Sequence, residues 1–130
     1  MRAQISMEFM TLLGILLAML VIFSLQAYFR TVELNVIAVR GAGELVCREL
    51  AFELNTAGAV GDGYEHYFVL PAKLNYGTEY SMEVDAGNGV VRANWSNGQC
   101  ALPIVVAEVL GEPSNGPNSI QNQGGVIVFE

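Results

Sequence analysis

Residues 4–30 read QISMEFMTLLGILLAMLVIFSLQAYFR, and this stretch decides what kind of protein the chain is. Residues 9–29 within it are twenty-one consecutive positions without a formal charge. At about 1.5 Å per residue, a helix of that length spans about 31 Å, which matches the hydrocarbon core of a bilayer. A secretory signal peptide would have a shorter apolar run followed by small residues, and residues 25–27, LQA, form no such cleavage site. We therefore expect the helix to meet lipid and to remain attached to the rest of the chain.

A short motif stands in front of the apolar run. Residues 4–9, QISMEF, have the form Q-x-S-x-E-F and follow Arg2 and Ala3. This hexapeptide resembles the class III signal peptide of archaeal type IV pilin-like subunits, although Ala3 stands where that family often has glycine. The resemblance implies that a prepilin peptidase cuts the bond between Ala3 and Gln4 on the cytoplasmic side of the membrane. Residues 1–3 would then be a cleaved leader, and the apolar helix would stay in the mature protein.

Glu8 is the charged residue of this motif. Burying its carboxylate without a partner costs at least a few kcal/mol, so we expect it to be paired. Cleavage would give Gln4 a new ammonium group one helical turn away, and in a filament the ammonium of a neighbouring subunit would neutralise Glu8. On this basis we assign Gln4, Glu8 and Phe9 to assembly. The alternative is a static signal anchor, in which Glu8 lies at the cytoplasmic water interface near a helix N-terminus, where a negative charge is favoured.

Length and composition leave room for one small domain beside this helix. Of the 130 residues, about 100 follow the apolar segment, which is enough for a single globular head. Hydrophobic residues make up 52% of the chain and the mean hydropathy is +0.39, above the values usual for soluble proteins. The formal net charge of −7 argues against capture of nucleic acid or anionic lipid by the head. We therefore expect no nucleic-acid partner.

Residues 30–57 continue as an amphipathic helix, with apolar residues recurring at helical spacing among charged ones. In this pattern Glu49 and Glu53 fall on solvated faces. Gly41 and Gly43 each cost about 1 kcal/mol relative to alanine, so we expect a bend or a close helix contact there, or alternatively a break between two helices. The glycine-rich residues that follow end the helix, with Gly58 available for the left-handed cap.

The hydrophobic period changes from about 3.6 to about 2 beyond Gly63, which predicts strands. Five strands are expected, at residues 64–70, 78–84, 90–95, 102–110 and 125–130. Short turns between them favour an antiparallel meander of four or five strands over residues 64–130, with the apolar last strand inside the sheet. The predicted fold class is α+β, with a helix over residues 4–57, about 80 Å long, packed on the sheet. The pilin resemblance implies the same ladle-shaped layout.

Cys47 and Cys100 are the two cysteines of the chain. The topology places both outside the cell, where oxidation is permitted, and a disulfide between them would tie the helix to the sheet. The alternative is two separate buried thiols that behave as small hydrophobes. Neither cysteine has a second ligand at zinc-like spacing, so no metal site is predicted.

Few other residues suggest chemistry. Asn94 begins the sequon Asn94-Trp95-Ser96 on the expected outward face of its strand, so it is a candidate glycosylation site, while Trp95 on the opposite face is expected to pack against the helix. His66 has no second histidine or cysteine near it and is assigned a structural role. No nucleophile elbow, phosphate-binding loop or regular calcium loop occurs, so we predict no enzymatic activity and no cofactor.

Together these features lead to one functional expectation. The chain is expected to be a pilin, a structural subunit that is inserted in the cytoplasmic membrane and then polymerised into an extracellular homopolymeric filament for surface adhesion. The resemblance implies three partners besides the membrane and further copies of the chain, namely a prepilin peptidase, an assembly ATPase and a membrane platform. The alternative function is a minor or tip pilin, or a membrane-anchored extracellular binding domain.

Overall fold

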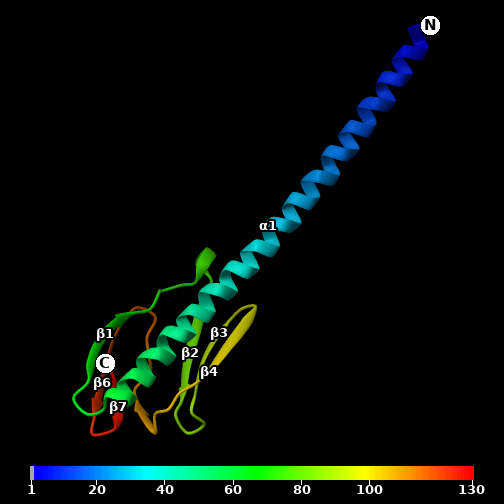
Figure 1. Ribbon diagram of the computed structural model, residues 1–130. Helices are drawn as coiled ribbons and strands as arrows, with labels where there is room; N and C mark the ends of the chain where they lie inside the picture. Colours follow the sequence, from blue (N-terminus) through cyan, green and yellow to red (C-terminus); the bar gives the residue numbers. More distant parts are fainter. Residues whose placement is uncertain (1) are drawn as a thin grey trace. The chain divides into compact units, whose positions relative to one another are not determined.

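The computed structural model describes residues 2–130, with side chains from residue 7 onward. Helix α1 spans Arg2–Val60, 59 residues, without interruption (Figure 1). The chain divides into two compact units, unit 1 ending at Asn35 and unit 2 comprising Val36–Glu130. The continuous helix contains the whole expected helical range, so the alternative of two separate helices is wrong.

The helix ends later than predicted. Its last residue is Val60, and Gly61 has a φ of 88°, the left-handed conformation that favours glycine. The N–H of Gly61 donates to the carbonyl oxygen of Ala57 at 3.2 Å. Gly58 was therefore the wrong choice of cap, because it still lies within α1 and the positive φ occurs three residues further on.

Unit 2 contains seven strands in two sheets. The strands are β1 (Glu65–Val69), β2 (Tyr80–Asp85), β3 (Val90–Trp95), β4 (Gly98–Pro103), β5 (Glu108–Leu110), β6 (Pro117–Gln123) and β7 (Val126–Phe129). A short 3₁₀ turn, Asn75–Gly77, precedes β2. The four-stranded sheet has the order β1-β6-β7-β5, and the three-stranded sheet has the order β2-β3-β4. All pairs are antiparallel except β5 with β7.

The predicted fold class is confirmed, since one long helix packs on antiparallel-rich sheets, but the strand count is wrong. The expected strand at residues 102–110 is split, because the chain leaves the three-stranded sheet after Pro103 and joins the four-stranded sheet at Glu108. Between them the N–H of Val105 donates to Oδ1 of Asn55 on α1 at 2.7 Å. Strand β6 was missed because its sequence, PNSIQNQ, is mostly polar. The expected interior position of the last strand is confirmed, since β7 lies between β6 and β5.

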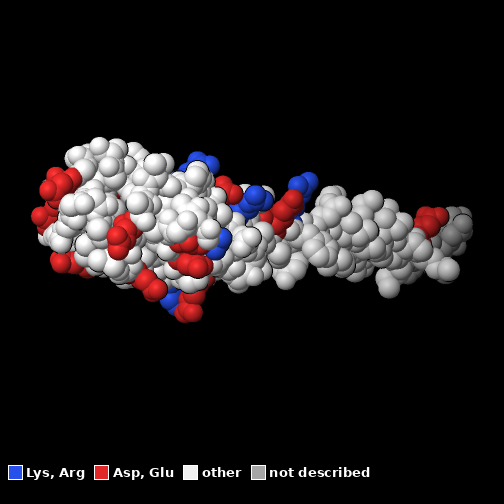
Figure 2. Space-filling view, turned by 90° about the horizontal axis from the view of Figure 1, so that it is seen from below, with Lys and Arg blue, Asp and Glu red and all other residues white. Residues whose placement is uncertain are grey.

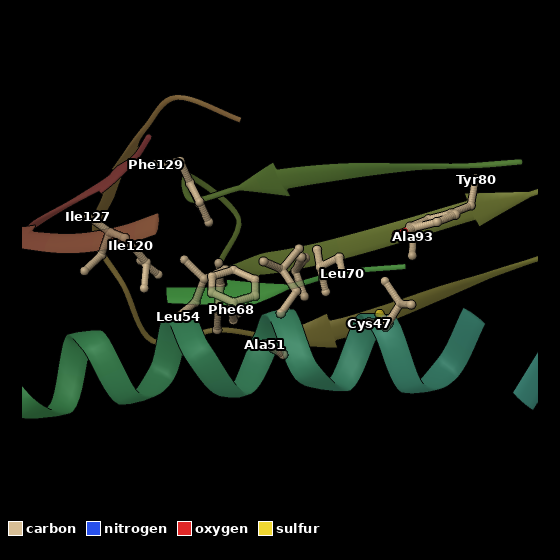
Figure 3. Packing of buried hydrophobic residues seen from close by; sticks show 14 of the residues in the cluster. Cys47, Ala51, Leu54, Phe68, Leu70, Tyr80, Ala93, Ile120, Ile127 and Phe129 are labelled. Atoms are coloured by element: carbon tan, nitrogen blue, oxygen red, sulfur yellow. The ribbon is translucent and has the colours of Figure 1, made fainter. Parts of the chain in front are cut away.

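The core of unit 2 lies between α1 and the inner faces of the sheets (Figure 3). Leu50 and Leu54 of α1 have no exposed surface, and neither do Ile120 and Ile127 of the four-stranded sheet. Burying an aliphatic side chain of this size contributes about 1.5–3 kcal/mol, so this layer supplies the main stabilisation of the head. The amphipathic pattern of the helix therefore determines which of its faces receives the sheets.

Candidate functional site

The apolar surface of unit 1 is the most unusual feature of the molecule. Every described side chain from Met7 to Leu34 is exposed, including Phe9 and Phe29 at the two ends of the uncharged run, at 62% and 66%. By length and composition, α1 is the one helix among the described residues that could cross a membrane. A surface of this kind is unstable in water, because a soluble monomer rarely exposes a contiguous apolar patch of this size. It requires lipid or other protein around it.

The serine and threonine hydroxyl groups described on this surface donate hydrogen bonds to the helix itself. Thr11 donates to the carbonyl oxygen of Glu8 at 2.8 Å, and Ser24 donates to that of Leu20 at 2.8 Å. Such bonds to a carbonyl three or four residues earlier give these two hydroxyl groups a partner in an apolar environment. The surface is therefore suited to a medium without water.

Glu8 interrupts this apolar surface with a charge. Its side chain is exposed, and no ion pair or side-chain hydrogen bond to it occurs among the residues whose side chains are described. The side chains of Ala3 and Gln4 lie outside the described residues, so the predicted cleavage bond and the predicted pairing with Gln4 remain predictions. A carboxylate in this position needs a cationic partner where lipid or protein excludes water from it.

Cys47 and Cys100 come together in unit 2. Cys47 lies on the buried face of α1, and Cys100 is half-buried on β4, where it pairs in register with Ala93 of β3. Both are free thiols in the structure, and they are close enough for Cys100 to affect the pKa of Cys47. Burial, followed by the hydrogen bond with Cys100, raises the pKa of Cys47 to about 12. The structure thus places side by side the two residues that were predicted to be linked, and the disulfide itself stays a prediction.

Asn94 lies near the end of β3, where its neighbours in register are Ser81 and Gln99. The strand alternates as expected, with Ala93 and Trp95 buried and Asn94 only partly so. The sequon therefore begins on the solvent face of the three-stranded sheet, in the orientation that was predicted. Glycosylation of Asn94 stays a prediction.

A polar cluster that the sequence analysis missed joins α1 to β1. Glu53 was assigned to a solvated face, but it is only 7% exposed, and this assignment is wrong. Its Oε2 lies 2.9 Å from Nδ1 of His66 and accepts a hydrogen bond from the Tyr64 hydroxyl at 3.4 Å. Burial and the Glu53 carboxylate raise the pKa of Tyr64. The signal was present in the helical spacing, because Glu53 follows Val46 by seven residues and Leu50 by three.

This cluster holds the helix against the edge of the four-stranded sheet and gives His66 the structural role expected for it. Among the described residues, no three His, Cys, Asp or Glu side chains are grouped as metal ligands.

No family model matches the chain, and the comparisons with curated proteins and with solved structures also give no match.

Proposed function

We propose that the chain is a pilin-like structural subunit, which is inserted in the membrane as a precursor, cleaved before Gln4 and polymerised into an extracellular filament. The observation that supports this most directly is the exposed apolar surface of residues 9–29 next to Glu8, whose carboxylate has no partner among the described side chains. An anchor that only held a domain at the membrane would have no need for a charge at this position. A helix that leaves lipid for a bundle of identical helices needs a cation from a neighbour to neutralise it.

The favourable free energy of polymerisation comes from packing between helices rather than from the hydrophobic effect itself. Lipid tails are as apolar as the Leu, Ile and Phe side chains of this segment, so moving the helix from lipid to protein changes little in hydration. Close contacts between helices supply the difference, and Gly14 offers a place for such a contact, since nothing lies within 4 Å of a Cβ built there. The assembly ATPase and membrane platform would supply the work of extraction.

The test uses the full chain, expressed in cells that contain a prepilin peptidase and an assembly machine. Filaments are sheared from the cell surface, and the N-terminal sequence of their subunit is determined. We expect filaments whose subunit begins at Gln4. An intact N-terminus at Met1, with all of the protein in the membrane fraction, would show a static anchored domain instead.

A pair of variants tests the role of Glu8. Glu8→Gln removes the charge and should abolish incorporation into filaments. Glu33→Gln is the matched control, because Glu33 is exposed on the same helix and already lies 3.7 Å from the Arg30 guanidinium. Normal filament yield from Glu8→Gln would contradict the pairing.

A further inference from the structure

The side of α1 that faces away from the sheets carries an apolar stripe in unit 2. We call it the outer stripe, and it consists of Ile37, Gly41, Leu45, Arg48 and Phe52. Spacings of three and four residues place these positions on one face of the helix, opposite the buried Val46, Leu50 and Leu54. Its three large apolar side chains, Ile37, Leu45 and Phe52, are 59%, 65% and 66% exposed. Nothing within the described chain covers them.

No contact among the described residues of the same chain accounts for the residue types at two positions of the outer stripe, Gly41 and Arg48. Gly41 weakens the helix by about 1 kcal/mol relative to alanine, yet a Cβ built there would meet no atom within 4 Å. Arg48 has no ion-pair partner among the residues whose side chains are described, whereas every other Lys or Arg of that set lies within 4.0 Å of a carboxylate. Phe52 and Arg48 are of residue types that are enriched at protein interfaces, and Gly41 leaves room for a close approach on the same face.

The opposite side of unit 2 presents a surface of complementary chemistry. The outer face of the four-stranded sheet, as we define it, consists of the residues that point away from the helix on its four strands: Glu65, Tyr67 and Val69 on β1, Pro117, Ser119, Gln121 and Gln123 on β6, Val126, Val128 and Glu130 at β7, and Glu108 and Leu110 on β5. The intervening residues, such as Phe68, Ile120 and Ile127, point toward the helix, so this face points away from it. Leu110 lies next to Val128 in register, and Glu108 lies next to Val126. Tyr67, Val69 and Leu110 are 71%, 67% and 53% exposed.

This face is acidic as well as apolar. The four strands that form it contain no Lys or Arg, and no basic residue follows Arg92 in the chain. Tyr67 donates to the Glu65 carboxylate at 2.9 Å, while Glu108 and Glu130 have no ion-pair partner among the described side chains. Carboxylates outnumber basic groups on the visible surface of unit 2 (Figure 2). The outer face therefore combines exposed apolar side chains and carboxylates with the uncharged polar side chains of β6. The outer stripe offers apolar side chains and a guanidinium to it.

We propose that the outer stripe of one copy binds the outer face of the four-stranded sheet of the next copy, with Arg48 directed at the carboxylates of that face. This inference rests on the proposed filament and names a contact between its heads. Pairing like surfaces would bring Arg48 against Arg48, or acidic face against acidic face, and such juxtapositions are strongly unfavourable. Because the two surfaces lie on opposite sides of unit 2, each bound copy still offers one free surface. Such a head-to-tail contact propagates into a polymer instead of closing as a dimer.

Charge exchange in the full chain tests the contact. Arg48→Glu should lower the yield of sheared filaments by more than about tenfold, because it sets like charges against each other. Adding Glu108→Lys or Glu130→Lys to the same chain should restore the yield. Arg40→Glu is the matched control, since Arg40 is exposed on the same helix but already pairs with Glu44 at 3.0 Å, and it should change the yield much less.

The outcomes separate this contact from the proposed function. If the unaltered chain forms no filaments, the proposed function fails and the contact falls with it. The proposed contact is wrong if the unaltered chain forms filaments and Arg48→Glu leaves their yield unchanged. It is also wrong if Arg48→Glu lowers the yield and neither lysine variant restores it. In both cases the proposed filament function is unaffected. Thermal unfolding of each variant in detergent identifies a loss of folding, which these exposed positions should not cause.

Discussion

The indole ring of Trp95 lies against Gly43 of α1, so closely that a Cβ atom at that glycine would come within 2.6 Å of the ring carbon Cζ3. A glycine in a helix interior weakens the helix, but here the missing side chain makes room for the largest residue of the three-stranded sheet. The glycine that sequence analysis associated with a bend or a close contact thus marks a close contact. It fixes how near β3 approaches the helix.

Replacing Gly43 by alanine should therefore destabilise unit 2, although alanine favours the helix by about 1 kcal/mol. Displacing the Trp95 ring from a packed site should cost about 1–3 kcal/mol and outweigh that gain. Thermal unfolding of the full chain in detergent, followed by Trp95 fluorescence, measures the balance.

Gly41→Ala is the control for this experiment. Nothing lies within 4 Å of a Cβ built at Gly41, so alanine there should raise the unfolding temperature through helix propensity alone. We therefore expect the unfolding temperature to fall for the alanine variant of Gly43 and to rise for that of Gly41. Equal effects would show that the Trp95 contact does not limit the size of residue 43.

Removing the imidazole of His66 should destabilise unit 2 through the carboxylate that it leaves behind. In His66→Ala, the buried Glu53 keeps only the weak hydrogen bond from Tyr64 at 3.4 Å. A buried charged group that loses its main partner costs about 1–3 kcal/mol, which urea unfolding at neutral pH would detect.

Two further variants test this explanation of the His66 effect. Adding Glu53→Met to His66→Ala should recover part of the lost stability, because no unpaired charge is then buried. Lys73→Ala breaks the exposed pair with Glu79 and should cost less than about 1 kcal/mol. If His66→Ala costs no more than Lys73→Ala, the cluster does not stabilise the contact between helix and sheet.

The long helix and the orientation of most strands could be predicted because each depends on a local period. The apolar run at residues 9–29 has one compatible structure in lipid, and the alternation at residues 90–95 specifies the buried face of β3 directly. Glu53 illustrates the limit of such arguments, since its charge suggested solvent while its helical position placed it in the core. Glu53 is buried because His66 and Tyr64, which lie more than ten residues further along the sequence, are partners of its carboxylate.

The strand count failed for a related reason. Strand β6 lies inside its sheet, between β1 and β7. Its sequence is mostly polar, so a prediction based on hydrophobic residues does not detect it. Asn122 of that strand is 3% exposed because it donates to the carbonyl oxygen of Ala57 at 2.8 Å, a contact between residues far apart in sequence. Buried polar residues of this kind are satisfied by tertiary partners that the sequence does not reveal.

Oxidation should link Cys47 to Cys100, since the structure brings the buried face of α1 that carries Cys47 close to Cys100 on β4. Each thiol loses one hydrogen, and oxidised glutathione accepts both as it is reduced. Closing a loop of this length should raise the free energy of unfolding by about 4 kcal/mol in the chain-entropy model. Mass spectrometry of peptides from the unreduced chain measures the link, and Cys100→Ala is the control that cannot form it. Two thiols that both remain free after treatment with oxidised glutathione, with unchanged stability, would contradict the prediction.

The reduced chain should lose stability at alkaline pH because of Cys47. Its pKa is about 12 in the folded protein against an ordinary value of 9.0, so below 9.0 the thiol is neutral in both states. Between 9.0 and about 12 only the unfolded chain releases the proton, which draws the equilibrium toward unfolding, so stability falls as the pH rises through this window. Unfolding temperatures of the reduced chain across the window measure the decline.

Cys47→Ala should make that decline shallower, and the remaining slope belongs to groups such as Tyr64 and Tyr80, whose pKa values burial also raises. Cys100→Ala should keep most of the slope, because burial is the largest cause of the Cys47 shift and persists without Cys100. The oxidised chain should behave like Cys47→Ala, since a disulfide has no proton to release. Parallel pH profiles for the reduced chain and Cys47→Ala would show that the thiol of Cys47 is not held neutral by its position between α1 and β4.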